Sequence, residues 1–219
     1  MPSVKIKKHT PDNDMTPFVD VAFLILTFFI LATKFKPEDA VEVKIPGSVS
    51  SIAVPEKDAF MVTVDKNARV FVSMDNPEFK TILIDNLNKT RNLGLTPAEM
   101  KAFTDAPSVG VPFSQLKGLL SLDAEAMKKV NQPGIPVDDS TGGELNYWVR
   151  DALVAYSGRK LSLLIKADND SKYPAFKQVL LAFKKNDQNK FLLITAPEDA
   201  PAGTPLYETR QRQVGQPSN

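Results

Sequence analysis

The chain has 219 residues, and its 27 basic and 26 acidic side chains give a formal net charge of +1, so no global charge attracts nucleic acid. It contains no cysteine and a single histidine, His9, which excludes disulfides and thiol nucleophiles and leaves few ligands for a metal. Hydrophobic residues at 42% and charged residues at 24% are typical of globular proteins. We therefore expect one or two folded units with no cofactor, metal, nucleic-acid partner or enzymatic activity.

An unusually apolar stretch lies near the N-terminus, and its sequence from Thr16 to Thr33 is TPFVDVAFLILTFFILAT. As a helix, residues 15–32 would be about 27 Å long, close to the roughly 30 Å of a bilayer's hydrocarbon core. A cleaved signal peptide and a buried globular helix are the alternatives; an internal acid, and a bulky Ile30 where cleavage needs a small residue, argue against the first. The pattern predicts a transmembrane helix over 15–33, preceded by an N-terminal segment, 1–14.

Lysines flank this stretch on both sides. Lys5, Lys7 and Lys8 precede it, whereas Lys34 and Lys36 follow it. Because positive charge favours the cytoplasmic side, the three-to-two excess predicts a cytoplasmic N-terminus. The C-terminal portion would then lie across the membrane.

Asp20 is the only charged residue within the apolar stretch. An ionised carboxylate in a membrane costs about 2.5–3.5 kcal/mol on insertion scales, so it persists when it faces protein or water, or when it is protonated part of the time. Two interpretations remain open: a proton relay, or a side chain that reaches the headgroups from its place near the helix start. Helical spacing aligns Asp20 with Thr16 and Thr27 on a candidate pore-facing side, although Thr27 could instead bond to its own helix. Pro17 fits the first turn.

The residues around Asp20 resemble the N-terminal signature of the ExbD/TolR family. The matching stretch runs Asp14-Met15-Thr16-Pro17-Phe18-Val19-Asp20-Val21, followed by a span rich in Phe and Leu. The resemblance implies a single-pass subunit of the bacterial inner membrane with a periplasmic domain. It implies that Asp20 carries the proton, that Thr16 and Pro17 form the helix entry, and that the subunit works as a homodimer inside a pore of ExbB- or TolQ-like multi-span proteins. No family role is assigned to Thr27.

After the span, the pattern predicts a linker over 34–58 and a folded domain over 59–198. In the linker, residues 41–46 alternate as a short strand does, and a flexible connector follows from Gly47. The domain is expected to hold a hairpin, then a helix, a strand, a helix and a strand, with the helices on one face of the sheet; these elements fall at 60–64 with 69–73, 144–156, 161–165, 171–185 and 190–195. We thus predict a single N-terminal transmembrane helix followed by an α+β domain.

Part of this domain also resembles the family's exported domain. The element Ile165-Lys166-Ala167-Asp168, followed by Tyr173 and a helix, carries the resemblance. Asp168 and Asp170 lack the glycine and glutamate of a calcium loop, so we expect them to serve in a turn and as a helix cap.

Residues 77–143 depart from the compact family pattern and carry helix signals of their own. An apolar-periodic segment opens at Asn76-Pro77 and closes at Gly94, Thr96 begins a capping box, and Pro112 precedes a further apolar-periodic piece at 113–120. We predict a helical insertion, which could be a docking surface or a structural elaboration. The proline-containing tail, 199–219, is predicted to be disordered.

The function that this pattern favours is proton-motive-force transduction for TonB-dependent outer-membrane transport, with a TonB-like protein as a further partner. The first alternative is a TolR-like role in envelope integrity with possible peptidoglycan binding, which a local excess of basic residues over 159–190 would suit. The second is a membrane-anchored binding module without proton work. A secreted enzyme with a cleaved leader has little chemical support.

Overall fold

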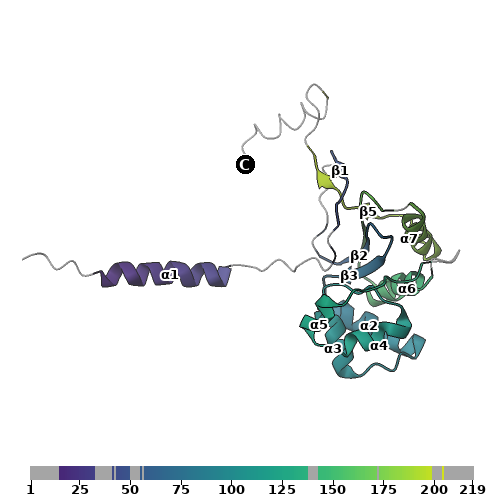
Figure 1. Cartoon of the computed structure of the whole chain (residues 1–219), viewed down its shortest axis with the longest axis horizontal. Coiled ribbons are helices and arrows are strands. Elements are labelled where there is room, and N and C mark those ends of the chain that lie inside the picture. The colour runs from purple at the N-terminus through teal and green to yellow at the C-terminus, as the bar shows by residue number, and fades with distance from the viewer. Residues whose placement is uncertain are drawn as a thin grey trace, which may run out of the picture. The chain divides into compact units, whose positions relative to one another are not determined.

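The computed structural model describes residues 15–32, 41, 43–49, 55, 57–137, 143–171, 173–198 and 204. The chain divides into two compact units, Met1–Glu38 and Asp39–Asn219, which we describe separately (Figure 1). The predicted N-terminal segment, 1–14, and the predicted disordered tail, 199–219 apart from residue 204, lie outside the described residues. So do 138–142 of the predicted insertion and much of the predicted linker.

The first unit contributes one helix, α1 (Thr16–Ala32). Its first turn is closed by the amides of Phe18 and Val19, which both donate to the carbonyl of Met15 at 3.1 Å. Pro17 fits this turn because a helix leaves its first amides without intrahelical partners. The helix predicted over 15–33 therefore forms within one residue of each expected end. Among the described residues, no helix combines the length and the apolarity that crossing a membrane requires.

The second unit is built on a four-stranded sheet in the order β3-β2-β4-β5. Its strands are β2 (Ala59–Val64), β3 (Val70–Met74), β4 (Ser162–Ala167) and β5 (Leu192–Leu193). β2 and β3 form the predicted antiparallel hairpin, whereas β4 pairs with both β2 and β5 in parallel. Asp65 shapes the hairpin turn because its Oδ1 accepts hydrogen bonds from the amides of Asn67 and Arg69.

Two strand predictions were wrong in position. The strand expected at 41–46 is β1 (Gly47–Ser48), within the stretch expected to be a flexible connector, and it pairs in parallel with β6 (Ala196–Pro197). The strand expected at 190–195 is shortened to β5, and β6 follows just beyond the expected range in the other sheet. Alternation predicts extended backbone, but the distant partner decides which residues form a ladder.

The predicted helical insertion is present, and its described residues, 77–137 and 143, hold one helix more than its signals indicated. Its helices are α2 (Pro77–Arg91), α3 (Pro97–Asp105), α4 (Phe113–Leu120) and α5 (Ala124–Lys129). The Thr96–Glu99 capping box opens α3 as predicted. α2 ends at Arg91, earlier than expected, and is capped by Asn92, which adopts the left-handed conformation at φ 51°. The short α5 went unpredicted, although the side chain of Asp123 caps it by accepting the amide of Ala126.

The insertion also covers the outer edge of β3. The amide of Val72 donates to the carbonyl of Val109 at 2.8 Å, and the amide of Val109 donates back at 2.9 Å. The amide of Ile135 donates to the carbonyl of Val70 at 2.8 Å. Because an open strand edge can pair with another chain, this coverage protects the sheet from edge-to-edge association.

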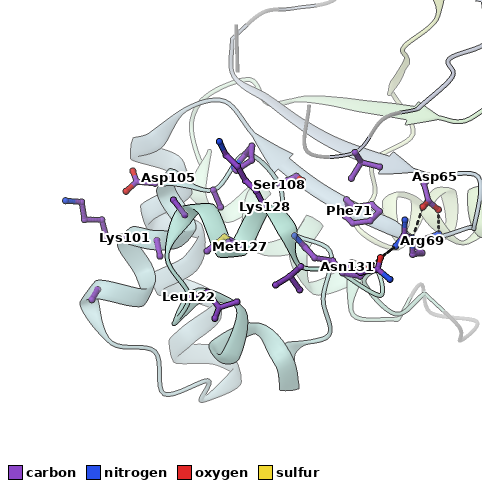
Figure 2. A pocket seen from close by; sticks show the side chains of 18 of the residues that line it. Asp65, Arg69, Phe71, Lys101, Asp105, Ser108, Leu122, Met127, Lys128 and Asn131 are labelled. Carbon is purple, nitrogen blue, oxygen red and sulfur yellow. Dashed lines mark hydrogen bonds and ion pairs between the residues drawn. The ribbon is translucent and has the colours of Figure 1, made fainter. Parts of the chain in front are cut away.

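Arg69 fastens the hairpin turn to the segment that follows α5 (Figure 2). Its Nε donates to Oδ2 of Asp65 at 2.7 Å, and its Nη1 donates to Asn131 Oδ1 and to the carbonyl of Gln132. The side chain of Gln132 turns inward and accepts the buried amide of Gly110 at 2.6 Å. The insertion is therefore held to the sheet by both backbone and side-chain bonds.

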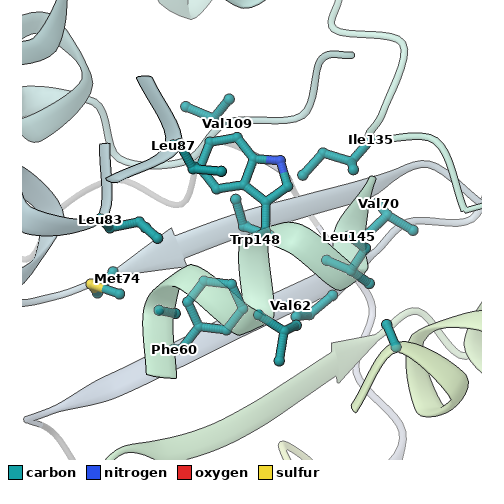
Figure 3. Close-up of a cluster of buried hydrophobic side chains, with 14 of the residues drawn as sticks. Phe60, Val62, Val70, Met74, Leu83, Leu87, Val109, Ile135, Leu145 and Trp148 are labelled. Carbon is teal, nitrogen blue, oxygen red and sulfur yellow. The ribbon is translucent and has the colours of Figure 1, made fainter. Parts of the chain in front are cut away.

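One apolar cluster fills the space between the helices and a single face of the sheet (Figure 3). The register places Phe60, Val62 and Val64 of β2 on this face, together with their partners in β3 and β4. The helices α6 (Leu145–Ala155) and α7 (Tyr173–Lys185) cover it, as predicted. Members of the cluster from the insertion are Phe79, Leu83, Ile84, Leu87, Leu95, Phe103, Ala106, Val109, Val111, Leu116, Leu119, Leu120, Met127, Ile135 and Val137. The insertion thus forms part of the core.

Trp148 of α6 is fully buried and links the insertion to the rest of the core. Its ring stacks with Phe103 of α3 and Phe113 of α4, with ring centroids 5.7 and 5.6 Å apart. Beside it, Oε2 of Glu144 accepts the backbone amide of Phe113 at 2.7 Å and so caps the first turn of α4. Burial raises the pKa of Glu144, against the opposing effect of this hydrogen bond.

Replacing Glu144 by alanine should destabilise the domain by about 1 kcal/mol, because the first turn of α4 loses its acceptor. For a unit of this size, the thermal midpoint should fall by about 2–4 °C. Circular dichroism of the full-length protein in detergent measures the shift. Glu144→Gln keeps an acceptor oxygen and should lie near wild type; an equal loss in both variants would contradict the capping role.

The phenol of Tyr156, at the end of α6, should make the free energy of unfolding depend on pH in the alkaline range. Burial raises the pKa of its phenol, and the nearby carboxylates of Asp75 and Asp58 raise it further. The folded pKa therefore lies above the unfolded value of about 10, so stability is retained below that pH and lost above it, by at most about 1.4 kcal/mol per pH unit. Urea unfolding between pH 8 and 11 tests this expectation.

The matched control for that experiment is Tyr173, whose side chain is exposed. Tyr156→Phe should flatten the alkaline loss of stability, whereas Tyr173→Phe should keep the wild-type slope. Identical slopes in wild type and Tyr156→Phe would rule out the phenol as its source.

Candidate functional site

The first candidate site is the carboxyl group of α1. At 100° per residue, Asp20 lies on one face of the helix with Thr16 and Thr27, as the sequence predicted. Asp20 is exposed and is the only ionisable side chain among the 17 residues of the helix. The helix therefore carries a single charged position, with no basic side chain among its residues to pair with it.

Thr27 does not present a free hydroxyl. Its Oγ1 donates to two carbonyls of its own helix, Phe23 at 3.0 Å and Leu24 at 2.9 Å. This is the alternative that the sequence left open for Thr27. The hydroxyl adds polar surface to the face that carries Asp20, two turns along the helix, but its proton already bonds to the helix backbone.

The remaining surface of α1 is apolar all round. Every large apolar side chain of the helix is at least half exposed, from 51% at Ile25 to 86% at Leu31. Since apolar surface in water costs about 25 cal/mol per Å², a helix of this composition requires lipid or protein around it.

The second candidate site lies where the chain enters the folded domain. The backbone of Lys44 is held twice: its amide donates to Oδ2 of Asp168 at 3.0 Å, and its carbonyl accepts the amide of Asn169 at 2.8 Å. Two residues further on, the carbonyl of Pro46 accepts the amide of Ala196 at 2.9 Å, which begins the β1–β6 ladder. We call these contacts of residues 44–48 with 168–169 and 196–198 the entry clasp.

Asp168 is the side chain on which the entry clasp depends. Its Oδ1 accepts the amide of Asp170 at 2.9 Å, and its own amide donates to the carbonyl of Val64 at 2.9 Å. The hydrogen bonds from Asp170 and Lys44 hold the pKa of this carboxyl below its usual value. Both carboxylate oxygens are therefore engaged, which agrees with the turn role predicted for Asp168.

The sequence did not indicate the role of Lys44 in this clasp. The contacts use its backbone, so no side-chain pattern could have signalled them. The predicted Asp168–Tyr173 element did mark the right turn, because the aspartate follows directly after a buried strand.

The protein thus combines an apolar helix that carries a single carboxyl group with a separate mixed α/β domain into which the chain is clasped. A family model described as Biopolymer transport protein ExbD/TolR matches residues 6–198, and the chain belongs to this family. No curated protein and no solved structure gives a significant match. The family has a role in energising biopolymer transport; its members are generally associated with the inner membrane and work with ExbB/TolQ-type membrane partners.

Removing the Asp168 carboxylate should free the entry segment without unfolding the domain. In Asp168→Ala, the amides of Lys44 and Asp170 lose their acceptors, so their hydrogen exchange should accelerate by about fivefold or more. Exchange measured by mass spectrometry on the full-length protein tests this. Asp170→Ala is the matched control, because that exposed carboxylate makes no such bond with Lys44; unchanged exchange at Lys44 in Asp168→Ala would contradict the clasp.

Proposed function

We propose that the protein is a proton-motive-force transducing subunit of an ExbB–ExbD-type complex, in which Asp20 carries the proton. The observation that carries this proposal is a single carboxyl group on a helix whose other surface is almost wholly apolar. Family membership supports the same role. The subunit would act as a mechanical transducer and would catalyse no covalent chemistry.

In this proposal α1 is seated in the bacterial inner membrane as a single pass. Its 17 residues extend about 26 Å, and a short segment is accommodated by local thinning of the bilayer and by flanking side chains that reach the interface. The lysine distribution favours a cytoplasmic N-terminus and a periplasmic domain.

Asp20 would alternate between its protonated and ionised forms. Moving one elementary charge through the membrane potential supplies about 2.3 kcal/mol per 100 mV. Because a single helix cannot enclose a proton path, an ExbB- or TolQ-like oligomer would provide the surrounding pore, and Thr16 and Pro17 would set the helix entry. Thr27 would contribute only polar surface to that face, since its hydroxyl is bonded to its own helix.

The entry clasp gives this proposal a route for force. A rotation or shift of α1 would pull on the segment after it, which is fixed to the domain at Lys44 and again at β1. The domain would pass the movement to a TonB-like protein and so energise outer-membrane transport. By analogy with the family, two copies would work together as a homodimer.

The decisive variant is Asp20→Asn, which keeps the size of the side chain and removes the titrating proton. In vesicles that contain the protein with its ExbB/TolQ-type partner, we expect a pH-sensitive dye to report proton flux for wild type and none for Asp20→Asn at equal expression. Asp14→Asn makes the same chemical change before the helix and should keep the flux. Full flux in Asp20→Asn would overturn the proton role and favour an anchored binding module.

The partner that the complex binds would distinguish a role in TonB-dependent uptake from a TolR-like role in envelope integrity. Co-purification of a TonB-like protein would support uptake, whereas retention on isolated peptidoglycan would favour a TolR-like role in envelope integrity. Both outcomes leave the proton role of Asp20 to be decided by the flux measurement.

A further inference from the structure

A pocket of about 470 Å³ opens between the hairpin turn and the helices α3 and α5 (Figure 2). Its walls come from three separate places in the chain: Phe71 of β3, Ala102 of α3 and Met127 of α5. The volume lies within the range of about 300–1,000 Å³ that is usual for ligand sites. The pocket belongs to the second unit and is lined by both the insertion and the hairpin, and the proposed proton function makes no use of it.

The floor of the pocket is apolar. Phe71 is 3% exposed and belongs to the sheet face opposite to the main cluster, since its register partner is Thr63. Its ring lies against Gly110, where a Cβ atom would come within 2.1 Å of it, so only glycine permits this floor. Apolar surface continues at the mouth of the pocket, where Leu122 and Val130 remain 38% and 40% exposed.

The rim of the pocket is cationic. Its lining includes four basic side chains, Lys66, Arg69, Lys101 and Lys128, but only two carboxylates, Asp65 and Asp105. Asp65 is neutralised by its ion pair with Arg69. Among the described residues, the side chains of Lys66 and Lys101 form no ion pair or hydrogen bond and both are exposed, although the charge of Lys66 acts on Asp168 and helps to lower its pKa. The rim therefore offers flexible positive charge around an apolar hollow.

We propose that this pocket binds an acidic segment of a partner polypeptide that inserts an apolar side chain. The apolar floor supplies the binding surface, and the rim cations supply charge complementarity. A polypeptide suits the site better than a small molecule, because the apolar surface at Leu122 and Val130 extends past the mouth, and because the cations are distributed around the rim.

The same pocket touches the segment through which the chain enters the domain. Val41 lines the pocket, three residues before Lys44 of the entry clasp. A segment bound there would therefore contact the insertion and the entry segment together.

A fluorescein-labelled peptide, Asp-Glu-Leu-Asp-Phe-Glu-Asp, provides the test, with full-length protein in phosphatidylcholine nanodiscs and fluorescence anisotropy as the readout. We expect saturable binding that weakens as salt is raised. A second peptide with serine in place of Leu and Phe should bind at least about fivefold more weakly, since each buried apolar side chain is worth more than 1 kcal/mol. Absence of saturable binding up to about 1 mM, or equal binding of both peptides, would overturn the proposal.

Charge reversal at neighbouring lysines of α5 provides the matched control. Lys128 lines the pocket and forms an ion pair of 3.8 Å with Glu125, whereas Lys129 does not line the pocket, although both are on the same short helix and both are exposed. Lys128→Glu should lower the affinity for the peptide by about fivefold, whereas Lys129→Glu should change that affinity by less than about twofold. Equal effects of the two changes would indicate general attraction to a positive surface and would overturn the site.

An apolar variant tests the mouth of the pocket independently of charge. Leu122→Ser should weaken binding of the peptide, whereas Val154→Ser, at an exposed position of α6 outside the pocket, should not. Dodecanoate provides the competing ligand: if it binds saturably while the peptide does not, the pocket is a site for an anionic lipid and the polypeptide assignment is wrong.

Discussion

The register of β2 against its two neighbours is the constraint on which the domain depends. It places Phe60, Val62 and Val64 on the face that the helices cover, and a slip of one residue would turn all three to the opposite face. The insertion depends on the same register, because its helices add to the same cluster and Trp148 stacks on two of them. The insertion, which departs from the family pattern in the sequence, therefore packs in the same core as the central sheet, so the stability of one depends on the other.

The same register also fixes the entry clasp. Asp168 follows β4 directly, and its amide continues the ladder by donating to Val64 of β2. Its carboxylate is thus carried by a strand that is buried in the centre of the sheet, while the segment that it holds comes from the direction of α1 along the chain. The entry segment is therefore fixed to a strand at the centre of the sheet, which is the fixed point that the proposed transduction would use.

Local signals in the sequence predicted most of the helices and the hairpin, because caps, turn residues and apolar periodicity act over a few positions. The Thr96 capping box and the Asp65 turn are examples. The β1–β6 pairing, the coverage of β3 by Val109 and the stacking on Trp148 could not be predicted, since each joins segments far apart in the chain. At the candidate sites, Asp20 could be predicted because it is a charged residue among apolar ones. The clasp at Lys44 could not, because its hydrogen bonds use backbone atoms and do not depend on the side chain.

The order of the contacts along the entry segment determines how a ligand and the helix could influence each other. Coming from α1, the chain reaches Val41 at the pocket before it reaches Lys44 at the clasp. A bound segment would therefore contact the chain at Val41, between α1 and the fixed point at Lys44. Movement of residues before Lys44 would leave the contacts of the clasp in place. The free energy that couples two sites acts equally in both directions. If one position of the entry segment increases affinity for the ligand, then the bound ligand stabilises that position. In this arrangement, proton-driven movement of α1 and occupation of the pocket would bias each other without any change in the fold of the domain.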